Sequence, residues 1–259
     1  MAGTNKSKTK DTGTAGPVVI LVAPQLGENI GMVARAMLNC ELGELRLVRP
    51  RDGWPNDAAI NAASGADKVI ATARLFPDTA AAIADLTMVY AASARPRGMV
   101  KDIATPRAAA VAMRTALAKG ERVGILFGPE RSGLLNDDIA LADAVIEAPL
   151  NPAFASLNLA QAVLIIGYEW YQLGVEVPAE RLDSGAALPA PKADLVNFFE
   201  RLEQHLDQSG FMRPPEKRPT MVRNLRNLFQ RARLTEAEVK TLHGVISALW
   251  DAGRKMRKD

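Results

Sequence analysis

The chain has 259 residues, of which 48% are hydrophobic and 24% charged, and its formal net charge is +3. It can therefore form a sizeable core, and no apolar run approaches the roughly 20 residues that a membrane helix needs. The single cysteine, Cys40, excludes an intramolecular disulfide, and a zinc site built from Cys and His is not expected. These features predict a cytoplasmic protein without a metal.

Residues 1–16 are polar and carry lysines but no apolar segment, which predicts a disordered tail rather than a secretory signal. From residue 17 to 173, short β-branched runs alternate with alanine-rich amphipathic runs. Strands are predicted at Val18–Val22, Leu45–Val48, Thr87–Ala91, Arg122–Phe127 and Ala144–Glu147. Helices are predicted at Asn29–Asn39, Asp57–Ala63, Asp78–Asp85, Arg107–Lys119, Asp137–Ala142 and Leu157–Leu173. This alternation is typical of an α/β fold, a parallel sheet with helices on both faces, which binds ligands at the carboxyl ends of its strands.

Residues 174–192 are rich in proline, alanine and glycine and are interpreted as a linker. Residues 193–259 show only helical periodicity, and Thr235 with Glu238 matches a capping box, so an extension of three helices is predicted. Between Phe211 and Arg233 the sequence has one acidic residue, Glu216. The same segment has a set of basic residues, namely Arg213, Lys217, Arg218, Arg223, Arg226, Arg231 and Arg233. Such a run indicates either a polyanionic partner or a solvated helix face.

The usual nucleotide-binding signatures are missing. The glycines at 27 and 31 follow the first predicted strand but do not complete G-x-G-x-x-G, and the chain has no G-x-x-x-x-G-K-[ST] loop. Neither a conventional dinucleotide enzyme nor a nucleoside triphosphatase is supported.

Two polar segments follow early predicted strands. In the first, Asn29 is a candidate helix cap, Gly31 permits close backbone approach, and Arg35 taken alone suits a surface arginine about one and a half turns into the helix. In the second, Arg95 and Arg97 follow small residues and either hold phosphate or are solvated.

Two further segments lie after later strands. Glu130, in the turn between Gly128 and Gly133, stands at the carboxyl end of a strand, where the active-site groups of such sheets collect. Ser156 is a candidate cap for the long helix that follows, whose free amides suit an acceptor group, and Asn158 taken alone suits local capping.

Taken together, three segments resemble a known family. N-I-G-x-x-A-R at 29–35, F-G-x-E-x-x-G-L at 127–134 and S-L-N-x-x-x-A at 156–162 resemble, in order and spacing, the three motifs of the SPOUT superfamily, in its TrmH branch of RNA ribose methyltransferases. The resemblance covers Val18 to Leu173. The run from Arg218 to Phe229 also resembles the helical extension of members that methylate the 2′-hydroxyl of nucleotide 32 in the anticodon loop of tRNA.

The resemblance implies a deep trefoil knot in the C-terminal part of the sheet domain, which physical reasoning alone would not select. It also implies a homodimer with its active site at the subunit interface, S-adenosylmethionine as methyl donor and tRNA as partner, without a metal or a membrane. Carried over, the cofactor residues are Ala92, Ser93, Ala94, Gly128, Ala148 to Leu150, Ala155, Ser156 and Leu157.

The catalytic residues implied by the resemblance are Arg35, Glu130, Asn158 and Asn29, with Arg35 acting across the dimer interface. Because a guanidinium stays protonated and is a poor general base, we expect Arg35 to orient the hydroxyl and stabilise the developing alkoxide. Glu130 is expected to hold an arginine, and Asn158 to fix the geometry of the site. The expected substrate-binding residues are Arg95, Arg97, Arg223 and Arg226.

Three alternatives stay open at this point. One is a ribose methyltransferase for another tRNA or ribosomal RNA position, and another is a non-catalytic RNA-binding protein of the same fold. The third, an unrelated α/β enzyme with a nucleotide cofactor, is disfavoured by the missing glycine and phosphate-loop signatures.

Overall fold

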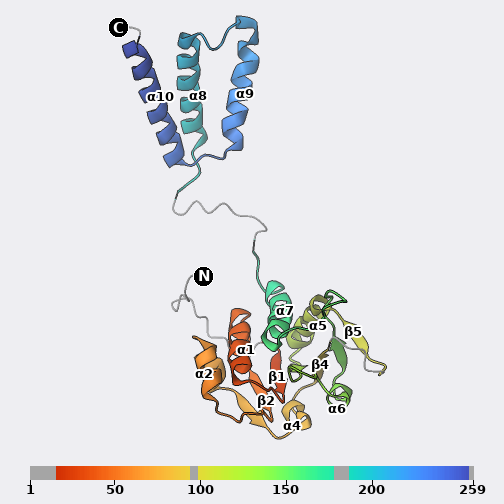
Figure 1. Cartoon of the computed structure of the whole chain (residues 1–259). Helices are drawn as coiled ribbons and strands as arrows, with labels where there is room; N and C mark the ends of the chain where they lie inside the picture. The colour runs from red at the N-terminus through yellow and green to blue at the C-terminus, as the bar shows by residue number, and fades with distance from the viewer. Residues whose placement is uncertain (1–15, 94–98, 178–186, 257–259) are drawn as a thin grey trace. The chain divides into compact units, whose positions relative to one another are not determined.

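The fold was analysed in a computed structural model, which describes residues 16–93, 99–177 and 187–256 (Figure 1). The chain forms two compact units, residues 1–177 and 178–259, each of which is described by itself. None of the helices in the described ranges is long and apolar enough to cross a membrane.

The first unit is built on a sheet whose seven described strands all pair in parallel. The strands are β1 (Val18–Val22), β2 (Leu45–Val48), β3 (Arg74–Phe76), β4 (Met88–Ala92), β5 (Asp102–Ala104), β6 (Val123–Phe127) and β7 (Ala144–Ile146), in the spatial order β3-β2-β1-β6-β4-β7-β5. Central strand β1 is buried at all five positions, and its Val19 lies opposite Leu45 on one side and Ile125 on the other. Because the strands are parallel, their carboxyl ends gather along one edge. The predicted parallel α/β fold is confirmed, while the trefoil knot stays a prediction.

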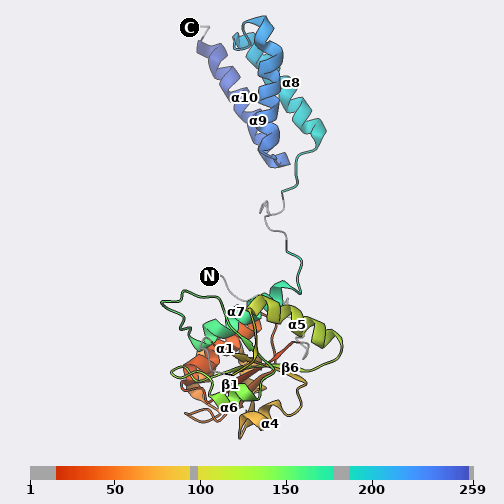
Figure 2. The same ribbon diagram turned by 90° about the vertical axis from the view of Figure 1, so that its right-hand side faces the viewer.

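Helices cover both faces of the sheet (Figure 2). One face carries α1 (Gly27–Asn39), α2 (Asp57–Ala63), α3 (Asp67–Ala71), α5 (Pro106–Ala118) and α7 (Leu159–Gln172), whose buried side chains share one core cluster with the strands. The other face carries α4 (Thr79–Ile83) and α6 (Asn136–Ala140), packed on a smaller cluster. The larger core therefore lies under the helices that contain the first and third sequence motifs.

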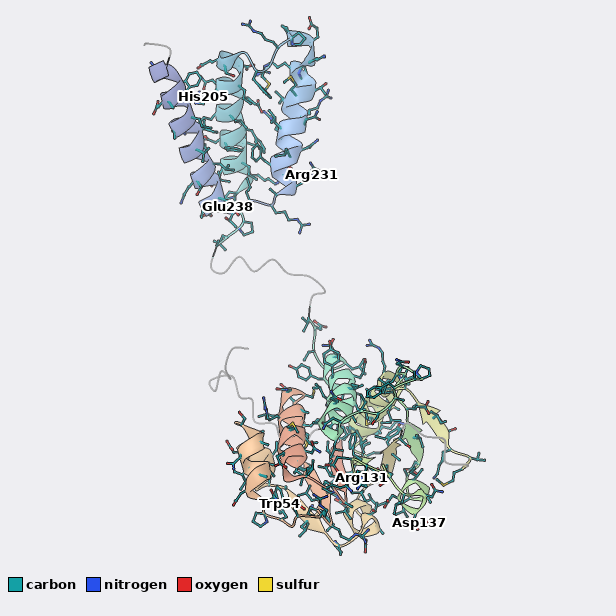
Figure 3. All side chains as sticks on the ribbon, viewed as in Figure 1. Trp54, Arg131, Asp137, His205, Arg231 and Glu238 are labelled. Atoms are coloured by element: carbon teal, nitrogen blue, oxygen red, sulfur yellow. The ribbon has the colours of Figure 1, made fainter. Side chains whose placement is uncertain are left out.

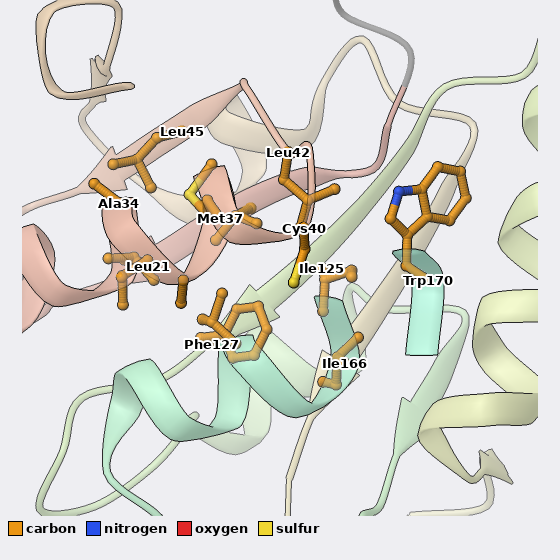
Figure 4. Close-up of a cluster of buried hydrophobic side chains, with 14 of the residues drawn as sticks. Leu21, Ala34, Met37, Cys40, Leu42, Leu45, Ile125, Phe127, Ile166 and Trp170 are labelled. Carbon is orange, nitrogen blue, oxygen red and sulfur yellow. The ribbon is translucent and has the colours of Figure 1, made fainter. Parts of the chain in front are cut away.

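Figure 4 shows part of that larger core, in which Met37 of α1 and Cys40, the residue directly after this helix, share one cluster with Ile166 and Trp170 of α7. Burial raises the pKa of the Cys40 thiol to about 11, so this cysteine serves packing rather than redox chemistry. On the same helix, a Cβ at Gly31 would lie 2.3 Å from the carbonyl oxygen of Ala59. The expectation that Gly31 permits close backbone approach is therefore confirmed, with α2 as the neighbour.

Most predicted elements are present, several with the same bounds. Three short elements were not predicted from the sequence, namely α3, β3 and β5. The two strands each have three residues, lie at the two ends of the strand order, and are largely exposed. Such strands lack the buried apolar run that a sequence pattern reports.

The second unit consists of α8 (Lys192–Ser209), a short 3₁₀ turn (Pro215–Lys217), α9 (Arg218–Arg231) and α10 (Glu236–Met256). Its core is small: Leu195, Phe198 and Phe199 of α8 pack with Val239 of α10, and the ring of Phe229 meets that of Phe198 edge-on at 4.9 Å. Thr235 and Glu238 form the predicted capping box, with the Thr235 amide donating to Glu238 at 2.7 Å and the Glu238 amide to Oγ1 of Thr235 at 3.3 Å. The three predicted helices are therefore confirmed.

Candidate functional site

A pocket of about 270 Å³ opens at the carboxyl ends of β4, β6 and β7, beside the start of α7. The described residues that the family resemblance assigns to the cofactor line it, with the exception of Pro149; they are Ala92, Ser93, Gly128, Ala148, Leu150, Ala155, Ser156 and Leu157. The segment with Ala94, Arg95 and Arg97 lies outside the described residues. The structure thus brings together side chains from three separate loops of the sequence.

Sequence reasoning missed the apolar floor of this pocket, which is formed by Phe127, Ile146, Leu159 and Ile166. Each of them lies in a predicted strand or in the predicted long helix, so their apolar character was explained by packing and gave no functional signal. Two charged residues of one turn also line the pocket, Glu130 and Arg131, of which Arg131 is labelled in Figure 3. The pocket therefore combines an apolar floor with small residues, hydroxyl groups and two charges.

The turn between β6 and α6 needs its glycines. A Cβ at Gly128 would lie 2.1 Å from the amide nitrogen of Leu134, and Gly133 has a φ of +66°, a backbone conformation that favours glycine. The amide of Gly133 donates to the carbonyl of Pro129 at 2.8 Å, which closes the turn. This geometry fixes the intervening Glu130 and Arg131 at the edge of the pocket.

The Glu130 carboxylate lies at the N-terminus of α1. It accepts hydrogen bonds from the backbone amides of Gln25 at 2.8 Å and Leu26 at 3.3 Å, and from Nδ2 of Asn29 at 2.7 Å. Amides that precede a helix lack partners within it and attract anions. In the described ranges these three N–H groups take the oxygens of Glu130, and the expectation that Glu130 holds an arginine stays a prediction.

Asn29 is not the helix cap that the sequence suggested. The helix begins at Gly27 after Leu26, and Asn29 lies in its first turn with 4% of its surface exposed. Its Nδ2 is bound to Glu130, while its Oδ1 accepts a hydrogen bond from Nδ2 of Asn158 at 3.1 Å. The side chain therefore joins two loops instead of capping its own helix.

Asn158, rather than Ser156, caps α7. Its Oδ1 accepts from the amide of Ala160 at 2.9 Å, and its own amide donates to Oε1 of Gln161 at 3.0 Å. The expected local capping by Asn158 is thus confirmed, and the same side chain also reaches Asn29. We refer to Glu130, Asn29 and Asn158 as the motif network, because each comes from a different one of the three sequence motifs.

The hydrogen bonds of the motif network run in one direction. A carboxylate only accepts, so Asn29 must point its amide nitrogen at Glu130 and its oxygen at Asn158. Asn158 then points its nitrogen at Asn29 and its oxygen at the start of α7. Each amide orientation follows from the one before, so the network holds the starts of α1 and α7 beside the turn that borders the pocket.

Arg35 lies eight residues after the start of α1, just over two turns along it rather than the expected one and a half. It belongs to an exposed stripe with Glu28, Met32 and Asn39, and it does not line the pocket of its own chain. No group in the described ranges accepts a hydrogen bond from its guanidinium.

The two candidate arginines of α9 differ in their contacts. Arg226 forms two hydrogen bonds to the carboxylate of Glu203 on α8, at 2.7 and 3.0 Å, and these raise the pKa of Arg226. Arg223 is exposed and bonds only within its own helix, to the carbonyl of Pro219 at 3.2 Å and to Oγ1 of Thr220 at 3.3 Å. Arg226 is thus engaged in joining two helices, whereas Arg223 keeps its charge facing solvent.

Comparison with known proteins explains this arrangement. The sequence model of the SpoU rRNA Methylase family matches residues 16–168. The chain belongs to the SpoU methylase family. A second model, that of the C-terminal domain of the tRNA methyltransferase TrmJ, matches residues 193–259 of this SpoU methylase.

Named relatives place this SpoU methylase in the TrmJ group. It is 37% identical over 238 residues to the tRNA (cytidine/uridine-2′-O-)-methyltransferase TrmJ of Pectobacterium atrosepticum, covering 89% of this chain and 95% of the relative. It is 32% identical to the tRNA (cytidine/uridine/adenosine-2′-O-)-methyltransferase TrmJ of Pseudomonas aeruginosa, covering 88% and 91%. Among solved structures, TrmJ from Z. mobilis ZM4 is 49% identical with a TM-score of 0.78, over 90% of this chain and 99% of that one.

Proposed function

We propose that this protein transfers the methyl group of S-adenosylmethionine to the ribose 2′-hydroxyl of tRNA, at nucleotide 32 of the anticodon loop. The observation that carries the proposal is the pocket at the carboxyl edge of the sheet, beside the motif network that joins all three family motifs. The relatives over most of the chain, which are named as tRNA 2′-O-methyltransferases, support the same substrate class.

The residues of the pocket fit S-adenosylmethionine. The apolar floor of Phe127, Ile146 and Ile166 suits a planar adenine, and alanines at the opening allow a ligand to lie against the backbone. A volume of about 270 Å³ lies close to the lower end of the usual range for small-molecule sites. When bound, this group supplies a methyl on a sulfonium, which is already activated for transfer to a nucleophilic oxygen.

Arg35 is proposed to act on the ribose rather than on the donor. Its guanidinium would donate hydrogen bonds to the 2′-hydroxyl oxygen and orient it toward the methyl group. It would stabilise the negative charge that develops on this oxygen as the bond from oxygen to the methyl carbon forms, the carbon–sulfur bond of the sulfonium breaks, and the hydroxyl proton passes to water. The exposure of Arg35 and its absence from its own chain's pocket support a role in the site of a second subunit.

That arrangement requires a homodimer, and the surface of the first unit offers a face for it. Met32 of α1 and Leu164 and Tyr168 of α7 are apolar or aromatic, exposed, and carried by two helices that pack against each other. We propose that a second copy of the chain covers this face and brings its Arg35 to the pocket. The motif network fixes the starts of both helices, so it would hold the dimer interface in a fixed position relative to the pocket.

The second unit is proposed to grip tRNA. Arg223 and Arg231 on the exposed side of α9 have no acidic partner in the described ranges, which leaves their charge available to phosphates. Arg95 and Arg97 are proposed to contact phosphate near the target ribose. The cytoplasmic location of the protein stays a prediction.

The test is to incubate the purified full-length chain with S-adenosylmethionine and tRNA transcripts, then map the product by nuclease digestion and mass spectrometry. The expected product carries one added methyl on nucleotide 32 and resists alkaline cleavage there, because the 2′-hydroxyl that drives cleavage is blocked. A transcript with 2′-deoxyribose at position 32 is the matched control and accepts no methyl. A methyl on a base, or none on either transcript, would contradict the proposal.

A further inference from the structure

Arg131 is the one basic residue among the described residues that line the pocket. Its side chain is exposed, and no group in the described ranges forms a hydrogen bond or ion pair with it. Resting on the proposed function, we propose that Arg131 binds the carboxylate of the methionine part of S-adenosylmethionine.

The neighbouring acid does not satisfy Arg131. Glu130 is adjacent in sequence and lines the same pocket, yet its two oxygens accept hydrogen bonds from Gln25, Leu26 and Asn29. Those bonds direct the carboxylate toward α1. The guanidinium of Arg131 is therefore a positive charge at the pocket edge whose nearest acid in sequence is already engaged elsewhere.

The ligand supplies the matching group. S-adenosylmethionine carries a sulfonium, an ammonium and one carboxylate, so only the carboxylate calls for a cationic partner. A carboxylate that enters a partly apolar pocket loses hydration and needs a charged or hydrogen-bonding partner. The planar fork of a guanidinium meets both oxygens of a carboxylate at once, which makes Arg131 suited to this task in a way that a lysine is not.

The backbone around Arg131 is rigid enough for selective binding. The turn from Gly128 to Leu134 is closed by the hydrogen bond from Gly133 to Pro129 and by the close approach at Gly128. A side chain on such a turn starts from a fixed position, so less ordering is required when the ligand binds. The alternative partner, a tRNA phosphate at the pocket edge, is distinguished by experiment.

The experiment is isothermal titration of the full-length chain with two ligands, S-adenosylmethionine and its decarboxylated analogue. The variants are Arg131→Gln, Arg131→Lys, and Arg107→Gln as a matched control, since Arg107 is an exposed arginine paired with Glu169 on the surface and lies outside the pocket. Arg131→Gln is expected to weaken S-adenosylmethionine binding on the order of 10- to 100-fold and Arg131→Lys by less. In both Arg131 variants, the affinity for the decarboxylated analogue is expected to change by less than about twofold. In the Arg107→Gln control, the affinity for either ligand is expected to change by less than about twofold.

Each result decides the matter. Equal affinity of the wild type and Arg131→Gln for S-adenosylmethionine would overturn this inference while leaving the proposed function standing. A weaker and less salt-dependent binding of tRNA by Arg131→Gln, with donor affinity intact, would also overturn it and assign the side chain to phosphate. Equal loss of affinity for both ligands would overturn it as well, because the effect of Arg131 would then not depend on the carboxylate. A wild type that binds neither ligand would overturn the proposed function itself.

Discussion

Nδ2 of Asn158 donates a hydrogen bond of 3.1 Å to Oδ1 of Asn29, although 129 residues separate the two in the sequence. The same asparagine caps α7 through its oxygen. One side chain thus has two separable roles, one local to its helix and one that links distant motifs. A substitution that keeps the first and removes the second measures what the link contributes.

Asn158→Asp is such a substitution. Aspartate caps helices about as well as asparagine, so α7 keeps its cap, but the donor to Asn29 is lost and a carboxylate faces the Oδ1 of Asn29. We expect a large fall in kcat with a small change in the urea midpoint. Asn158→Ala removes both roles and is expected to cost about 1 kcal/mol more stability. Wild-type kcat in Asn158→Asp would show that the link has no part in turnover.

Glu130→Gln tests the other end of the motif network. The glutamine amide has one acceptor oxygen, while three N–H groups point at this position, so at least one donor loses its partner. We expect a loss of about 1–3 kcal/mol of unfolding free energy, measured by urea denaturation, and reduced methyl transfer.

Glu28→Gln is the matched control for that variant. It removes one negative charge from the first turn of α1, close to the helix N-terminus that Glu130 contacts, but Glu28 is exposed and makes no hydrogen bond to another described side chain. A loss in Glu28→Gln as large as that in Glu130→Gln would attribute the effect to the charge near the helix terminus rather than to the hydrogen bonds.

The motif network shows where sequence reasoning stops. The buried apolar run of β1 and the mainly apolar run of β2 were sufficient to predict both strands, and the small residues of the pocket followed from the family resemblance. The partners of Glu130 did not follow, because two of them are backbone amides, at Gln25 and Leu26, whose side chains carry no signal. Only the fold reveals that a turn after β6 reaches the amides that follow β1.

An ion pair near the amino ends of the strands, at the edge of the sheet away from the pocket, predicts how the stability of the fold depends on acid pH. Arg46 is fully buried in β2 and donates hydrogen bonds to Asp85, which lower the pKa of Asp85 from 3.8 to about 2. A depressed folded-state pKa gives stabilisation that is present above about pH 4 and lost as the pH falls toward 2. We expect the urea midpoint of the wild type to decline over that interval and the decline to be smaller in Asp85→Asn.

Asp102→Asn is the control for this titration, because Asp102 is an exposed residue of β5 without a hydrogen-bonded side-chain partner in the described ranges. Its acid profile is expected to follow that of the wild type. Since 42% of the Asp85 side chain is exposed, solvent screening limits the size of the effect. Superimposable profiles for Asp85→Asn and the wild type would mean that the ion pair contributes nothing to acid stability.

The two arginines of α9 are expected to separate binding from folding. Arg223→Gln removes an exposed charge without an acidic partner, so tRNA binding is expected to weaken and the slope of log affinity against log salt to fall by about 1, with unchanged thermal stability. Arg226→Gln breaks the pair with Glu203 and is expected to lower the stability of the second unit. Filter binding over a salt series and thermal melts measure both. Identical salt slopes for Arg223→Gln and the wild type would exclude Arg223 from the tRNA contact.

Arg35 provides the sharpest test of how the site is assembled. Arg35→Lys keeps the charge and loses the guanidinium fork, so kcat is expected to fall by about 10²- to 10³-fold. The affinity for S-adenosylmethionine is expected to stay unchanged, because Arg35 does not line the pocket of its own chain and is proposed to contact the ribose rather than the donor. Ala155→Trp instead fills the pocket edge and is expected to abolish donor binding.

Mixing the two variants then reveals which subunit supplies the arginine. If Arg35 acts across a dimer interface, a mixed dimer unites the open pocket of the Arg35→Lys chain with the intact Arg35 of the Ala155→Trp chain, and activity returns at one of its two sites. If Arg35 acts within its own chain, every site in the mixture lacks either a pocket or the guanidinium, and none recovers. Co-expressed chains with different affinity tags, purified in tandem and assayed with tRNA, measure the difference. An inactive mixed dimer would contradict the role across the interface, whereas recovered turnover requires one site to be built from two chains.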